Sequence, residues 1–237
     1  MKYLYFDLKL FLILTFSFII MTVIGTLSHE CGHYAVAKYF GYDARIDYQS
    51  THIEGHKALN KLLEIEKKFT KEIRNNKKFP EKEYYEKSLI KYKEEGILIL
   101  LGGPLQTMIT GTVGLIFLII YRKKVFSSNK TSFAGWLLVF CSLFWLRQSA
   151  NSVLWTLAYL FTGEKSMRGD EMRLTRYFNM NIWTIHGITA IIGFIVLFIV
   201  IRILPKNQVL TFLAAGLVGG ISGYYLWLIQ FGKYILP

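Results

Sequence analysis

Five apolar runs dominate this chain, and each is long enough to cross a lipid bilayer. A spanning helix needs about 20 apolar residues, and a helix hydrogen-bonds its own backbone where no water can do so. Hydrophobic residues form 53% of the 237 residues, an excess over ordinary soluble domains. We therefore predict an all-α polytopic membrane protein, with spans near Leu8–Ser28, Ile97–Tyr121, Phe133–Leu160, Trp183–Leu204 and Val209–Phe231.

The first run ends in the sequence His29-Glu30-Cys31-Gly32-His33. This run is too long for a cleavable signal peptide, and it lacks a small-residue cleavage site. On a helix the two histidines lie one turn apart on the same face, so both imidazoles can bind one metal ion. Glu30 lies beside them, where it can take a proton from a metal-bound water. Because ionisable groups are costly inside a membrane segment, this cluster is the first candidate for a functional site.

A catalytic zinc ion usually has three protein ligands and an open position for water. Asp170 is our choice for the third ligand, because Gly169 before it lets the backbone turn tightly. Two further crossings separate the motif, at the end of the first span, from the loop after the third span. That loop therefore lies on the same side of the membrane as the motif, whereas Asp7 lies on the opposite side. Glu171 and Glu164 stay open as alternatives. Apart from the acids at residues 41–95, the chain contains only Asp7, Glu30, Glu164, Asp170 and Glu171.

Residues 41–95 form a polar insertion after the first span. Arg45-Ile46-Asp47-Tyr48 alternates polar and apolar residues, which predicts a short strand, and Lys/Glu-rich helices follow it. The insertion mixes 13 basic with 11 acidic residues, so the net charge of +12 does not indicate nucleic-acid binding. Cytoplasmic loops are enriched in Lys and Arg, which predicts a cytoplasmic insertion. Arg122-Lys123-Lys124, on the other side of the membrane, opposes this orientation.

The second and third spans carry residues that are unusual in lipid. Gly102-Gly103-Pro104 interrupts the second span, because proline kinks a helix and glycine allows close backbone approach. In the third span, Asn151 can orient a substrate carbonyl or stabilise an oxyanion, with interhelical hydrogen bonding as the alternative. Arg147 in the same span requires an ionic partner, a carbonyl group or a water-filled cavity.

The sequence from His29 to Gly41 resembles the site-2 protease family of intramembrane zinc metalloproteases. That family has Gly before the second His, Ala four residues after it and Gly four beyond, as this chain has in Gly32, Ala37 and Gly41. Gly103-Pro104 resembles the family's Gly-Pro element. Gly169-Asp170 resembles its later Asp-containing element, which supplies the third zinc ligand.

The chain also departs from the family pattern. Thr107 stands where the family often has Asn after its Gly-Pro element, which makes Thr107 a substrate-binding candidate together with Asn151. The Asn-x-x-Pro that precedes the family's Asp is absent. Glu171 follows Asp170, where the family usually has Gly.

The resemblance implies a membrane-embedded zinc metalloendopeptidase that cuts membrane-protein substrates, with Zn²⁺ held by His29, His33 and Asp170 and with Glu30 as general base. It implies one membrane domain with a three-helix catalytic core. Residues 97–182 then hold the second and third spans and the third-ligand loop, and residues 183–237 add two spans. The alternatives are a non-proteolytic metal-binding scaffold, a zinc protease of different architecture that cuts soluble tails, and a metal transporter.

Overall fold

The computed structural model describes residues 5–55, 57–127, 130–163 and 169–237, and most of them are helical. The prediction of a multi-pass helical protein with about five candidate spans is confirmed. Where one short strand was predicted, the structure has a small two-stranded sheet. The helical segments long and apolar enough to cross a membrane are Leu8–Tyr39, Lys82–Val125, Phe133–Thr162, Trp183–Ile203 and Lys206–Ile235.

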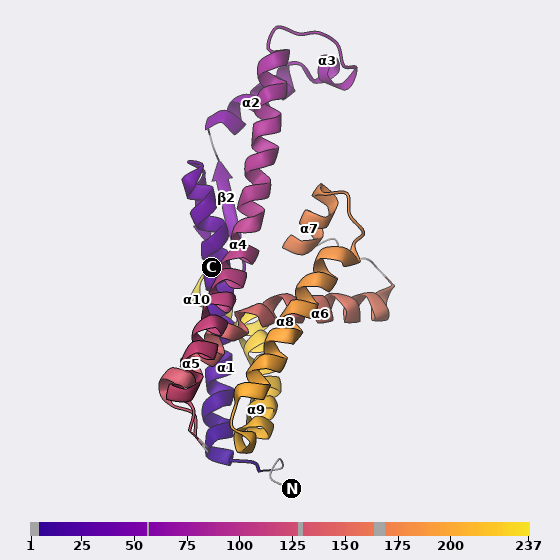
Figure 1. The fold of residues 1–237 in the computed structure, drawn as a ribbon. Coiled ribbons are helices and arrows are strands. Elements are labelled where there is room, and N and C mark those ends of the chain that lie inside the picture. Colours follow the sequence, from indigo (N-terminus) through magenta and orange to yellow (C-terminus); the bar gives the residue numbers. More distant parts are fainter. Residues whose placement is uncertain (1–4, 56, 128–129, 164–168) are drawn as a thin grey trace.

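The helices α1, α4, α8 and α9 run along the long axis of the molecule, and α2 and α3 lie at one end (Figure 1). In chain order the elements are α1 (Leu8–Tyr39), β1 (Asp43–Ile46), β2 (Thr51–Gly55), α2 (Lys57–Lys68), α3 (Thr70–Arg74), α4 (Lys82–Val125), α5 (Phe133–Ser142), the 3₁₀ turn η1 (Leu143–Trp145), α6 (Leu146–Thr162), α7 (Asp170–Tyr177), α8 (Trp183–Ile203), α9 (Lys206–Tyr224), the π-helical segment η2 (Tyr225–Phe231) and α10 (Gly232–Ile235).

α1 is long because residues 10–27 contain neither proline nor charge. The Asp7 side chain caps it by accepting a hydrogen bond of 3.0 Å from the backbone nitrogen of Leu10. Only 11% of its apolar window is buried inside the protein, so most of that surface is available to lipid. The buried residues concentrate toward the C-terminal part of the helix, where the His-Glu pair of the motif lies.

α4 starts within the polar insertion and runs for 44 residues to Val125. At 1.5 Å per residue this is about 66 Å, roughly twice the hydrocarbon thickness of a bilayer. The polar start of α4, residues 82–96, therefore projects beyond the apolar part. Our prediction that Gly102-Gly103-Pro104 interrupts the span is wrong, because the helix continues through Pro104. A missing backbone N–H is tolerated where a neighbouring helix covers the site.

The third candidate span is bent rather than straight. The 3₁₀ turn η1 joins α5 to α6, and α6 lies crosswise to α1 and α8 (Figure 1). This bend directs the polar residues of α6 into the protein. Gln148 is fully buried, and its Nε2 donates a hydrogen bond of 2.8 Å to Thr107 Oγ1 on α4.

β1 and β2 form an antiparallel hairpin after α1. The predicted strand extended to Tyr48, but β1 ends at Ile46 because Asp47 forms the turn instead. Its Oδ1 accepts hydrogen bonds from the backbone nitrogens of Gln49 (2.8 Å) and Ser50 (2.7 Å). Burial alone would raise the pKa of Asp47, but these bonds and the one to His52 hold it below its usual value.

The C-terminal end of the chain holds this hairpin in place. The backbone nitrogen of Tyr48 donates to the carbonyl of Leu236 (3.0 Å), and Trp227 Nε1 donates to the carbonyl of Tyr48 (2.8 Å). On its other side, Thr51 Oγ1 donates to the carbonyl of Glu30 on α1 (2.9 Å). The hairpin is thereby fixed against the helix that carries the motif.

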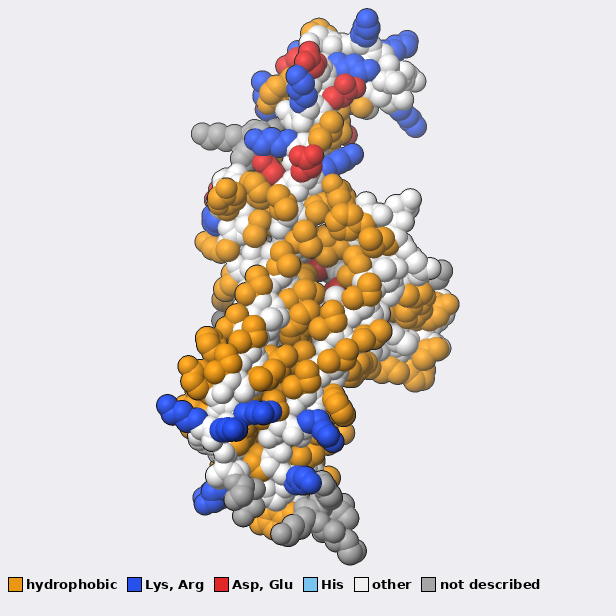
Figure 2. Space-filling view, in the orientation of Figure 1, with side chains coloured by type: hydrophobic (Ala, Val, Ile, Leu, Met, Phe, Trp, Pro, Cys, Tyr) orange, Lys and Arg blue, Asp and Glu red, His pale blue; other side chains and the backbone are white. Residues whose placement is uncertain are grey.

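Charge is distributed unevenly along the molecule. On the face drawn in Figure 2, a wide hydrophobic band separates an end with mixed charges from an end where Lys and Arg gather. An apolar band of this kind matches the surface of a multi-pass membrane protein. Below the motif, a packed core ties the long helices together; it consists of Leu14, Leu118, Val139, Phe140, Leu143, Val200, Leu204, Phe212 and Ala215.

Candidate metal centre

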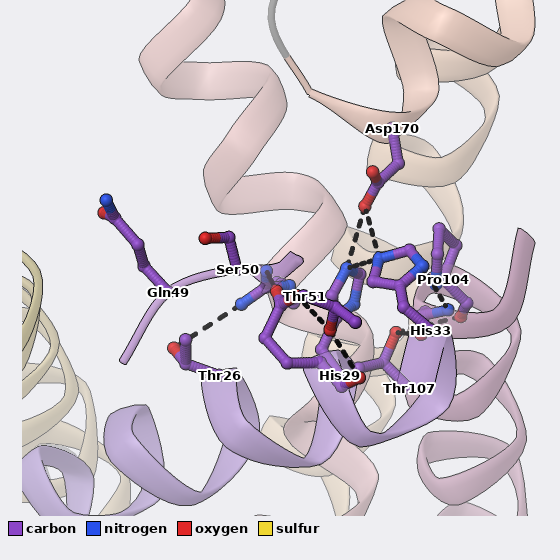
Figure 3. Close-up of polar contacts among 12 residues, drawn as sticks. Thr26, His29, His33, Gln49, Ser50, Thr51, Pro104, Thr107 and Asp170 are labelled. Atoms are coloured by element: carbon purple, nitrogen blue, oxygen red, sulfur yellow. Dashed lines mark hydrogen bonds and ion pairs between the residues drawn. The ribbon is translucent and has the colours of Figure 1, made fainter. Parts of the chain in front are cut away.

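The side chains of His29, His33 and Asp170 converge on one point (Figure 3). Asp170 Oδ2 lies 2.8 Å from His29 Nε2 and 3.2 Å from His33 Nε2, and the two ring nitrogens are 3.2 Å apart. The histidines come from one face of α1, and Asp170 is the first residue of α7. Gly169 has φ +98°, a backbone conformation suited to glycine, which permits the tight turn before Asp170.

The spacing of these three atoms fits a metal ion. Donors that each lie 2.0–2.1 Å from one tetrahedral zinc ion are about 3.3 Å from each other. The tautomer of His33 also fits, because its Nδ1 lies 2.7 Å from the carbonyl of Ile99 and donates to it. With Nδ1–H on this carbonyl, a neutral His33 has its lone pair on Nε2 and can bind a metal ion there. Without a metal ion, Nε2 donates to Asp170 when the ring is protonated.

Asp170 also has the charge that a ligand needs. Burial alone would raise the pKa of its carboxyl group, but the hydrogen bonds with His29 and His33 hold that pKa well below its usual range. The carboxylate is therefore ionised at neutral pH. Its nearest partners are the ring nitrogens of His29 and His33, at 2.8 and 3.2 Å.

Glu30 lies next to this group and is almost fully buried. One carboxylate oxygen accepts a hydrogen bond of 3.1 Å from Thr51 Oγ1 on the hairpin. The other lies 3.7 Å from Nη2 of Arg147 on α6. The ligand atoms of His29, Glu30 and His33 all lie within 4.8 Å of one another, so this buried group can hold a metal ion.

Arg147 thus has the ionic partner that the sequence required. Besides Glu30, its guanidinium contacts Thr26 Oγ1 on α1 at 3.5 Å. Sequence reasoning missed the pairing because the two residues lie in different spans. The bend at η1 brings them together, and nothing in the apolar pattern of residues 133–160 marks that bend.

Glycines bring α4 against the motif. A Cβ atom at Gly103 would overlap the Nε2 atoms of both histidines, and one at Gly32 would overlap the backbone of Gly102. These contacts confirm the expected close backbone approach. They also explain why glycine stands at Gly32 between the two histidines, since any larger residue would push α1 away from α4.

Of the two alternatives for the third ligand, Glu171 has other partners in the structure. Glu171 is buried and forms a hydrogen bond with Asn151; burial raises the pKa of its carboxyl group. Glu164 lies outside the described residues. Both histidines form their hydrogen bond with a carboxylate at Asp170.

The two substrate-binding candidates have different surroundings. Thr107 is fully buried, donates to the carbonyl of Pro104 (2.9 Å) and accepts from Gln148, so its hydroxyl links two helices. Asn151 lines a cavity of about 770 Å³ beside the metal centre. This polar cavity is also lined by Glu30, His33, Thr51, Arg147 and Asp170.

Comparisons of the chain with family models, with curated proteins and with solved structures give no match.

Proposed function

We propose that this protein is an intramembrane zinc metalloprotease of the site-2 protease type, which hydrolyses peptide bonds of membrane-embedded substrates. One observation carries the proposal: two imidazole nitrogens and a carboxylate oxygen lie 2.8–3.2 Å apart, beside a second buried carboxylate and within a bundle of apolar helices. His29, His33 and Asp170 hold the zinc ion. When bound, zinc supplies a Lewis acid that polarises a carbonyl group and makes water more acidic.

Glu30 is the general base in this proposal. Its carboxylate accepts a proton from the attacking water and delivers it to the leaving amine. Thr51 and Arg147 hold the two oxygens of this carboxylate from opposite elements, the hairpin and α6. Asn151 lies in the wall of the polar cavity, and in this proposal it contacts a peptide carbonyl.

The substrate is an extended segment of a membrane protein, since a helix hides its carbonyls in hydrogen bonds. Ser50, Thr51 and Ile53 of the hairpin line the polar cavity, so an unwound segment can add to the hairpin as a further strand beside Glu30. The catalytic core consists of α1, α4 and the α5–α6 span, with α8 and α9 added to it. The polar insertion lies in the cytoplasm.

Glu30→Gln tests this function. The variant keeps zinc and fold, because the change is nearly isosteric and Glu30 is no ligand in this proposal. It loses proteolysis by roughly 10²–10⁴-fold, since an amide cannot accept the proton. The assay compares wild type and variant on single-span substrates in membranes. Equal cleavage by both proteins refutes the mechanism, and cleavage by neither across a broad panel favours the metal-binding scaffold.

A further inference from the structure

A second cavity of about 340 Å³ lies beneath the metal centre, between α1, the η1–α6 bend and α9. We call it the apolar cavity. Its walls are mainly aromatic and aliphatic, and include Phe18, Met21, Phe140, Phe144 and Leu228. A cavity of about 150 Å³ with such a lining already binds a benzene ring, so this one has room for a phenylalanine side chain.

The apolar cavity adjoins the polar cavity. Arg147, Asn151, Leu154 and Tyr224 line both of them. Arg147 stands at this junction, and its buried Nε has no hydrogen-bond partner within the described part of the chain. A buried donor of this kind is costly unless a ligand satisfies it. A peptide carbonyl in the polar cavity is a suitable acceptor.

Glycines keep the apolar cavity open. A Cβ atom at Gly219 or Gly223 of α9 would collide with α1, so these two glycines are explained by helix packing. Gly25 on α1 and Gly220 on α9 also line or face this region, yet a Cβ atom at either would meet nothing within 4 Å. Glycine weakens a helix, and packing gives no reason for it at these two positions. The absence of side chains at Gly25 and Gly220 leaves the apolar cavity open.

We propose that the apolar cavity is the specificity subsite of the enzyme: it receives one large apolar side chain of the substrate, while Arg147 Nε binds a neighbouring peptide carbonyl. This inference rests on the proposed function. Along α1, the cavity residues Phe18 to Gly25 lie about 6–16 Å before His29. An extended peptide covers that distance with about two to five residues. The recognised side chain is therefore about two to five residues from the cleaved bond.

The test fills the cavity and measures side-chain preference. Gly25→Leu and Gly220→Leu each place a side chain in the open space, and Gly187→Leu on α8 is the matched control, since a Cβ atom there also meets nothing but lines neither cavity. The substrates are single-span peptides in liposomes in which one Phe is moved through a Leu-free, Ala-rich segment. Wild type and Gly187→Leu prefer Phe over Ala at one position by at least about tenfold. Either filled variant loses that preference while it still cuts the Ala peptide.

A binding measurement separates this inference from the proposed function. Peptides with benzoylphenylalanine at each position are irradiated with the Glu30→Gln variant, and the labelled protein residue is mapped. We expect one position to label Met21, and expect Gly25→Leu but not Gly187→Leu to abolish the label. This result holds even if no peptide is ever cut. Cleavage without a Phe preference, combined with peptide labels outside the cavity, overturns the subsite and leaves the protease intact. Labelling of Met21 by a photoactivatable phosphatidylcholine, but by no peptide, also overturns it.

Discussion

At the scale of single residues, the site depends on three donor atoms that meet at one point. Two of them have a neighbour that fixes their chemistry: the carbonyl of Ile99 sets the tautomer of His33, and the two rings keep Asp170 ionised. His29 meets the other two through Nε2, and its buried Nδ1 has no hydrogen-bond partner among the described residues. In the proposed metal site, all three side chains are therefore required.

We expect the purified protein to bind about one zinc ion per chain, and His29→Ala or His33→Ala to reduce this to near zero. Removal of one of three ligands leaves two, which is too few to hold the ion against a chelator. Elemental analysis after dialysis gives the stoichiometry, with Cys31→Ala as the control. Unchanged zinc in both histidine variants would contradict the site.

Asp170 and Glu171 are adjacent but differ in partners. Asp170 contacts the histidines, whereas Glu171 is bonded to Asn151. We expect Asp170→Ala to lose both zinc and activity, and Glu171→Ala to keep the zinc. The same metal analysis decides between them, and the opposite outcome would make Glu171 the ligand.

A third residue-scale prediction concerns Gly103. Because a Cβ atom there would overlap both Nε2 atoms, Gly103→Ala should remove zinc although no ligand is changed. Gly187→Ala, where a Cβ atom meets nothing, serves as the control and should bind zinc normally. Full zinc occupancy in Gly103→Ala would show that α4 lies farther from the motif.

At the scale of elements, the bend at η1 is what completes the site. It turns α6 across the bundle, so that Arg147 reaches Glu30 and Gln148 reaches Thr107. A buried charge that loses its partner is strongly destabilising. Arg147→Met should therefore lower the free energy of unfolding by about 3 kcal/mol, as measured by denaturant titration in detergent.

The double variant Arg147→Met with Glu30→Gln provides the check on that number. Since glutamine carries no charge, it leaves nothing unpaired when Arg147 is removed. The combined loss should be clearly smaller than the loss from Arg147→Met alone. A combined loss at least as large would mean that Arg147 stabilises through packing instead.

Some elements could be predicted from the sequence and others could not. Spans such as the one predicted near Leu8–Ser28, which lies within the helix Leu8–Tyr39, were predictable because apolar length is a local property. The motif was predictable because its two histidines are one helical turn apart. The bend at η1 was not, since an apolar run continues through it. The end of β1 at Ile46 was missed because Asp47 can either alternate in a strand or form a turn, and only its hydrogen bonds decide.

At the scale of the whole molecule, the two ends differ in charge and so predict an orientation. The insertion at residues 41–95 has 13 Lys and Arg, whereas Arg122, Lys123, Lys124, Lys130, Arg202 and Lys206 gather toward the opposite end. Basic residues near the membrane are retained in the cytoplasm, and acids count little in this rule. The arm formed by α2, α3 and the start of α4 should therefore lie inside the cell, together with α7 and Asp170.

Cysteine labelling of intact cells measures this orientation. In a background with Cys31→Ala and Cys141→Ala, a cysteine at exposed Asn75 on the arm should resist a membrane-impermeant maleimide, and one at exposed Lys123 should react. Permeabilised cells should label both, which shows that each cysteine is accessible. If Asn75→Cys reacts in intact cells and Lys123→Cys does not, the protein has the opposite orientation. The arm would then lie outside the cell. By crossing parity the metal centre stays on the arm's side in either case, so this experiment also decides from which side of the membrane water reaches Glu30.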